Sequence, residues 1–248
     1  MIDILAVPAL LIFVLVMVHA YFGLGILQRN IIFADLAIAQ FAALGSAISL
    51  GYLHGEYLFI ITLFFALLSA LLISLATVRD IAMEPFIGIL YVFGASAIML
   101  VLANSAEGVE HFKALLAADI LFTMEEEVLK SILLYLFIAL VMWKVYPRLE
   151  GFLKELLFLS MLALTVTSSV KLAGVFVVFI LLVGPALVAT MQQKFDKLMF
   201  AFVFGWCFGW SAIGIAYLFD MPTGYMIVFS GALLTLIATL ALSKSKNF

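Results

Sequence analysis

Charged residues are scarce in this chain. Only 11% of its 248 residues are Asp, Glu, Lys or Arg, while 67% are hydrophobic. Soluble domains carry about a quarter charged residues and about half apolar ones, so this balance excludes an ordinary soluble globule. No hydrophilic stretch is long enough to form a second folded domain. The composition therefore predicts one integral membrane domain over residues 1–248.

Cysteine, basic runs and catalytic motifs are also scarce or absent. Cys207 is the only cysteine, which excludes a disulfide and a cysteine-based metal site. The net charge of −3 comes without a basic run, so we expect no nucleic-acid partner. The sequence has no Gly-rich phosphate loop ending in Gly-Lys-Ser/Thr, no His-Glu-x-x-His and no Gly-x-Ser-x-Gly. We expect this chain to be no enzyme and to hold no cofactor of its own.

Long apolar runs dominate the sequence instead. About 20 such residues cross a bilayer, and the N-terminal run reaches Leu27, too long for a cleaved signal peptide. This predicts an all-α, polytopic membrane helix bundle of eight or nine transmembrane helices, surrounded by lipid. The nine expected spans lie near 4–27, 31–53, 57–77, 86–104, 128–147, 153–170, 172–192, 199–219 and 223–243. Eight remain if 153–170 is re-entrant or broken near Lys171.

The basic residues give an orientation. Cytoplasmic loops of membrane proteins carry an excess of Lys and Arg. With nine spans and the N-terminus outside, nine of the 12 basic residues face the cytoplasm and three do not. The nine are Arg29, Arg79, Lys144, Arg148, Lys154, Lys194, Lys197, Lys244 and Lys246.

The run over 172–192 ends in an unusual way. Gly184 and Pro185 fall deep in apolar sequence, and a proline there removes a backbone donor and clashes with the carbonyl four residues back. Such a helix break is tolerated in hydrocarbon only where protein or a water-lined cavity covers it. The chain then turns polar, so this pattern predicts a kinked helix that leads into a short cytoplasmic segment.

Polar side chains in the span over 31–53 suggest a pathway. Asp35 and Ser46 lie on one helical face with Ala39, Ala42 and Ser49. An acid about one turn into the membrane is a functional candidate, although the helix dipole and nearby Arg29 offer a structural explanation. His19 in the first span is interpreted as a neutral buried histidine rather than a metal ligand.

Several motifs together resemble one family. They are the Gly23–Arg29 turn, Ile87-Gly88-Ile89, Asp119-Ile-Leu121, and Lys171-Leu-Ala-Gly174 followed by Gly184-Pro-Ala186. In this order they resemble the permeases of ABC-type manganese/zinc/iron importers, over nearly the whole chain. The resemblance implies a type II ABC importer permease fold in a prokaryotic plasma (inner) membrane.

The resemblance also implies partners and sites. The permease would work as a homodimer with a separate ABC ATPase subunit that binds ATP, and with an extracytoplasmic metal-binding protein. The cargo would be a divalent metal ion of the zinc, manganese or iron class. The ATPase-docking segment would comprise Thr190, Met191, Gln192, Gln193, Lys194, Phe195, Asp196 and Lys197.

The span over 31–53 departs from the family pattern. Many relatives carry an aspartate there and a histidine four residues later, both meeting the metal. If Asp35 matches the acid, Ala39 stands at the histidine position; if Gly45 is aligned instead, Gln40 takes that position. We expect Asp35, Gln40 and Ser46 to line the pathway, with Asp35 as the metal ligand. Glutamine is a poorer zinc ligand than imidazole, so an oxygen-seeking ion becomes more plausible.

Two other functions fit the same sequence. One is an ABC permease for a metal chelate or a vitamin. The other is a secondary transporter or channel that works without an ATPase. The low number of ionisable groups within the spans favours a pore driven by a separate motor.

Overall fold

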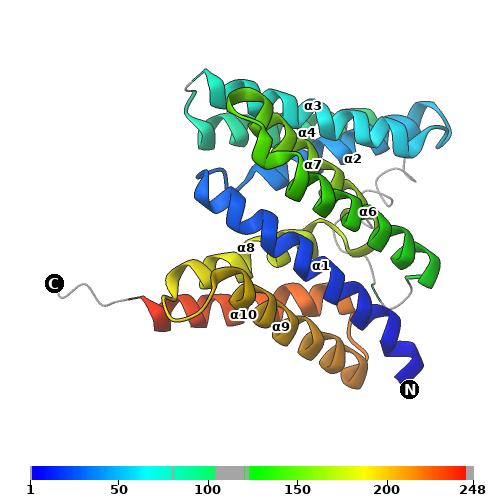
Figure 1. Cartoon of the computed structure of the whole chain (residues 1–248). Helices are drawn as coiled ribbons and strands as arrows, with labels where there is room; N and C mark the ends of the chain where they lie inside the picture. The colour runs from blue at the N-terminus through cyan, green and yellow to red at the C-terminus, as the bar shows by residue number, and fades with distance from the viewer. Residues whose placement is uncertain (1, 80, 104–119, 121–122, 244–248) are drawn as a thin grey trace. The chain divides into compact units, whose positions relative to one another are not determined.

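The computed structural model describes residues 2–79, 81–103, 120 and 123–243. Nearly all of the described chain is helical (Figure 1). The helices are α1 (Ile2–Gln28), α2 (Ala34–Tyr52), α3 (Leu58–Val78), α4 (Met83–Leu102), α6 (Glu125–Lys144), α7 (Gly151–Ala173), α8 (Val175–Met191), α9 (Lys197–Phe219) and α10 (Thr223–Leu242), with a short 3₁₀ turn η2 (Tyr146–Arg148) after α6.

Hydropathy predicted these elements well. Within the described residues, eight helices are long and apolar enough to cross a membrane, and α8, with 17 residues, is shorter. At about 1.5 Å per residue, α8 reaches about 26 Å, the short end of a bilayer span. The prediction of an all-α polytopic bundle of eight or nine spans is confirmed. Of the Asp119-Ile-Leu121 motif, Asp119 and Leu121 lie outside the described residues, and Ile120 is buried.

The proline of α8 lies within a continuous helix. Helix α8 runs through Gly184 and Pro185 to Met191, which agrees with one helix over this run, and a kink at these two residues stays a prediction. The chain is interrupted at Gly174, between α7 and α8, with φ 84° and ψ 160°, close to the junction expected near Lys171. Only glycine adopts that backbone conformation readily, whereas proline removes a single hydrogen bond from a helix that packing supports.

The contacts divide the chain into two compact units. Unit 1 comprises Met1–Arg29, Asp119–Lys130 and Phe176–Phe248, and thus contains α1, α9, α10 and nearly all of α8. Unit 2 comprises Asn30–Ala118 and Ser131–Val175, with α2, α3, α4, α7 and most of α6. The interpretation of residues 1–248 as a single domain stays a prediction.

Unit 1 is assembled through glycines at helix crossings. A Cβ on Gly23 of α1 would lie 1.9 Å from the carbonyl oxygen of Leu182 on α8. A Cβ on Gly205 of α9 would lie 2.7 Å from Val16 on α1 and 3.2 Å from Pro185 on α8. Small residues allow the backbones of membrane helices to approach closely. Because lipid is as apolar as the helix surfaces, the hydrophobic effect does not hold such helices together, and van der Waals packing stabilises the contact instead.

Unit 2 is built around α2. This helix packs against α3, α4 and α7, and it is the most buried of the candidate spans, with 72% of its span buried. A Cβ on Gly45 would lie 2.7 Å from the carbonyl oxygen of Ile61, so the backbones of α2 and α3 touch there. Helices α3 and α4 expose large apolar side chains such as Phe64 and Leu100, which suit a lipid-facing surface.

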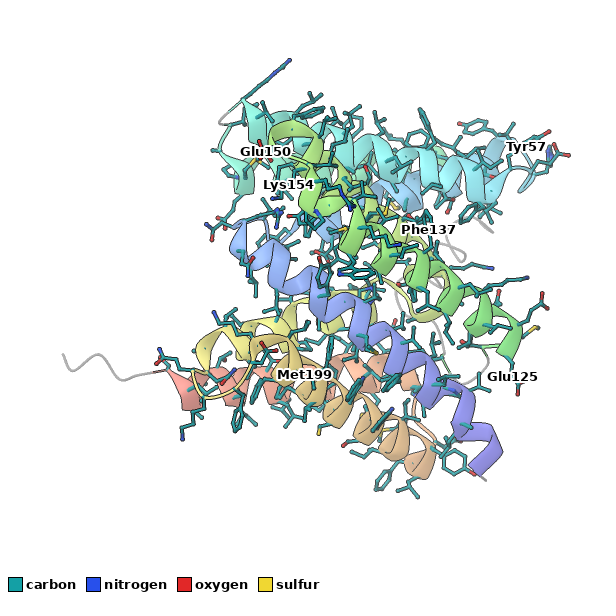
Figure 2. All side chains as sticks on the ribbon, in the orientation of Figure 1. Tyr57, Glu125, Phe137, Glu150, Lys154 and Met199 are labelled. Carbon is teal, nitrogen blue, oxygen red and sulfur yellow. The ribbon has the colours of Figure 1, made fainter. Side chains whose placement is uncertain are left out.

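Within each unit, the turns that carry basic residues lie at one end of the helices. In unit 1, the end of α1, the turn between α8 and α9, and the end of α10 lie at the same end (Figure 1). In unit 2, Glu150 and Lys154 at the start of α7 lie at the end opposite Tyr57 (Figure 2). Both arrangements are consistent with the predicted orientation, which places Arg29, Lys194 and Lys197 on one side of the membrane.

Candidate functional site

Two polar side chains of α2 are buried with an unpaired oxygen. Asp35 is 2% exposed and Gln40 is 4% exposed. Among the described residues, neither Oδ1 of Asp35 nor Oε1 of Gln40 has a hydrogen-bond partner in the structure. A buried polar atom without a hydrogen-bond partner lowers the stability of the fold. One ordinary explanation for such an atom is that an ion or a water molecule binds to it. These two oxygens are therefore available to a cation.

The same two residues face different directions. They are five positions apart, about 140° around a helix at about 100° per residue. Gln40 faces α4, where a Cβ on Gly94 would lie 3.0 Å from the Cβ of Gln40. Within the described part of the chain, no group of three His, Cys, Asp or Glu residues comes together to hold a metal. The geometry offers single oxygen ligands rather than a closed metal cage.

Ser46, the third expected pathway residue, has a different neighbour. Its Oγ lies 2.9 Å from Oγ1 of Thr62 on α3, beside the close approach at Gly45. The hydroxyl thus joins α2 to α3. A role for Ser46 in the pathway stays a prediction.

The segment that follows α8 forms a defined turn. Gln192 is only 8% exposed, and both the oxygen and the nitrogen of its side-chain amide form hydrogen bonds with the backbone. Its Oε1 accepts hydrogen bonds from the backbone N–H groups of Lys194 and Phe195, each at 2.9 Å. Its Nε2 donates to the carbonyl oxygens of Phe195 at 2.9 Å and of Ala189 at 3.4 Å. One buried amide therefore fixes the turn from within.

The remaining residues of the expected docking segment are placed at the two helix ends and on the surface. Thr190 donates a hydrogen bond to the carbonyl of Leu187, and Met191 is the last residue of α8. Asp196 caps α9, because its Oδ1 accepts the N–H of Met199 at 2.9 Å. The exposed members of the segment are Gln193, Lys194, Phe195, Asp196 and Lys197.

A buried hydroxyl cluster joins α6 to α7 within unit 2. The Tyr135 hydroxyl, on a side chain only 5% exposed, lies 2.8 Å from Oγ of Ser169 and 3.0 Å from Oγ of Ser168. Both serines also donate to the carbonyl of Thr165. Tyr135 is not among the site residues that the sequence predicts. The spacing of Thr165, Ser168 and Ser169 on one helical face was the available signal.

Replacing Tyr135 with phenylalanine tests the stabilising role of this cluster. The change removes the shared hydroxyl and keeps the ring, so we expect a loss of about 1 kcal/mol, the size of a hydrogen bond between membrane helices. Thermal unfolding in detergent measures it. Tyr225→Phe, on an exposed side chain of α10, is the matched control and should leave the midpoint unchanged. An equal midpoint for both variants would contradict the stabilising role.

His19 is fully buried on α1. Its Nδ1 lies 2.7 Å from the carbonyl oxygen of Leu15, while Nε2 has no partner within the described part of the structure. The bond to Leu15 fixes Nδ1 as the donor, so the ring is held as expected for a neutral buried histidine. His19 lies in unit 1, and Asp35 and Gln40 lie in unit 2.

Two solved structures share the fold of this chain. A chain of PsaBC from Streptococcus pneumoniae in complex with Fab aligns with a TM-score of 0.76 at 19% identity, covering 95% of this chain and 91% of that one. A chain described as a metal-chelate type ABC transporter, in an inward-facing conformation, aligns with a TM-score of 0.69 at 15% identity, covering 94% and 85%. This chain therefore shares its fold with both of these chains.

Sequence comparison gives two matches. Residues 148–242 match the model of the ABC 3 transport family. The chain is also 29% identical over 169 residues to the "Probable iron transport system membrane protein" of Haemophilus influenzae. That match covers 61% of this chain and 62% of the relative. The predicted resemblance is confirmed.

Proposed function

We propose that this chain is the transmembrane permease subunit of an ABC-type importer for a divalent metal ion of the zinc, manganese or iron class. One observation carries the proposal: the family match over 148–242 includes the turn after α8, which is the segment expected to dock on the ATPase. A defined, solvent-facing turn at the end of a membrane helix can transmit movement between subunits.

The cargo is inferred from the buried oxygens of α2. A carboxylate oxygen of Asp35 and an amide oxygen of Gln40 suit manganese or ferrous iron better than zinc, which favours nitrogen and sulfur ligands. The relative from Haemophilus influenzae is named an iron transport system membrane protein, which is consistent with this choice. A small number of ligands is also suited to a transport pathway, because an ion that is bound weakly can leave the site as readily as it enters.

The proposed assembly follows from the family. Two copies of this chain form the pathway in a prokaryotic plasma membrane, two ATPase subunits bind ATP on the cytoplasmic side, and a binding protein delivers the metal outside. ATP binding draws the ATPase subunits together. The movement passes through residues 191–198 to the helices and changes access to Asp35. This chain itself binds no ATP.

Co-purification and metal uptake test this proposal. The tagged chain is isolated from membranes of its own host, and associated proteins are identified by mass spectrometry. Uptake of radioactive manganese, iron and zinc is compared in cells with and without the gene. We expect a P-loop ATPase to co-purify, and uptake of at least one ion to require both proteins.

Two outcomes would favour the other functions. Stable transport by the chain alone in liposomes without an ATPase would overturn the ABC mechanism in favour of a secondary transporter. ATPase-dependent uptake of a metal chelate, with no uptake of the bare ions, would overturn the ionic cargo and keep the permease.

A further inference from the structure

We infer that Gln192 is a positioning residue that shapes the turn 193–197 before any partner binds, so that Phe195 is presented to the ATPase subunit as the apolar contact. This inference rests on the proposed function, because the partner is the ATPase subunit of the same transporter. Its two parts are the internal order of the turn and the exposure of one aromatic side chain.

The order of the turn comes from a single side chain. Gln192 is buried, yet the five residues that follow it are exposed. Its amide makes four hydrogen bonds within the turn and to the end of α8, with both its acceptor and its donor used. A turn fixed by its own side chain loses little conformational entropy when it binds, which is the basis of preorganisation.

The exposed aromatic is Phe195. Its side chain is 67% exposed, and its ring lies nearly parallel to that of Phe200, with the centroids 6.4 Å apart. Lys194 and Lys197 flank it on the surface. This combination fits a partner surface with an apolar socket and an acidic rim, since buried aromatic anchors supply most of the energy of protein contacts. Met199, labelled in Figure 2, lies in the first turn of α9, the helix that follows this turn in the chain.

Hydrogen exchange tests the order of the turn without any partner. In the isolated permease, the amides of Lys194 and Phe195 should be protected by Oε1 of Gln192. Gln192→Ala should lose that protection, while Gln192→Glu keeps the acceptor and should retain most of it. Equal exchange in the wild type and Gln192→Ala would overturn the positioning role.

Binding of the co-purifying ATPase subunit tests the contact. We expect Gln192→Ala and Phe195→Ala to weaken association by about tenfold, with Gln192→Glu between them and the wild type. Leu218→Ala, an exposed residue at the far end of α9, is the control and should bind normally.

The outcomes separate the two levels of inference. A wild-type chain that binds no ATPase overturns the proposed function, whatever the exchange data show. A wild-type chain that binds, with Gln192→Ala and Phe195→Ala binding equally well, overturns this inference and leaves the proposed function intact. Each isolated variant should elute as a single folded species in size-exclusion chromatography, which excludes general misfolding as the cause.

Discussion

Replacing Gly23 with alanine should destabilise the protein strongly, although alanine is the better helix former. Helix propensity alone favours alanine by about 1 kcal/mol. The added Cβ, however, would lie 1.9 Å from the carbonyl oxygen of Leu182, which belongs to the backbone of α8 and cannot rotate away. Relief requires α1 and α8 to separate, so we expect a net loss of about 3 kcal/mol or more.

Gly214→Ala is the matched control for that experiment. Gly214 also lies within a membrane helix, α9, but a Cβ there would meet nothing within 4 Å. The higher helix propensity of alanine should then be the main effect, and Gly214→Ala should stabilise the protein slightly. Thermal unfolding in detergent, followed by size-exclusion chromatography of the remaining folded fraction, measures both variants. Midpoints that shift in the same direction would contradict the close crossing at Gly23.

The second large effect is expected at Asp35. Asn has nearly the same size and keeps the polar contacts, but it removes the negative charge that would attract a divalent cation. We expect Asp35→Asn to lower metal uptake by about tenfold or more, the equivalent of about 1.4 kcal/mol. Uptake of radioactive manganese and iron by cells carrying the variant measures it, at equal amounts of permease in the membrane.

Asp220→Asn controls for the loss of an acid. Asp220 is exposed and ends α9 in the left-handed conformation, with φ 52°, which asparagine adopts as readily. Its replacement should leave uptake unchanged. Unchanged uptake in Asp35→Asn itself would remove Asp35 from the pathway and leave the permease function in place.

The helices were predictable because each membrane-spanning helix needs an apolar run long enough to cross the bilayer. An apolar run of sufficient length must become a helix, whatever its other contacts, since every backbone group needs a partner within the segment. This is why the expected ranges match the observed helices within a few residues. The interruption between α7 and α8 lies at Gly174, three residues from the junction expected near Lys171, because only glycine readily adopts the φ of 84° found there.

The site was less predictable than the fold. Polarity pointed to Asp35 and the family pattern pointed to Gln40, and the structure buries both side chains. Polarity could not identify the partner of Ser46, because the contact with Thr62 joins two helices across a turn. Polarity also did not distinguish Gln192 from its neighbours, because the sequence of a polar segment does not show which of its amide side chains is buried. The importance of Gln192 appears only from its four hydrogen bonds.

The contacts of α2 constrain how access to Asp35 can change. At Gly45 the backbone of α2 touches that of α3, and at Gln40 it meets Gly94 of α4. A helix held by backbone contact on two sides cannot tilt alone without opening voids that cost dispersion energy. Exposure of Asp35 to one face of the bilayer would therefore require α2, α3 and α4 to swing together. Such collective motions take microseconds to milliseconds, so these three helices would set that time scale for any change in access to Asp35.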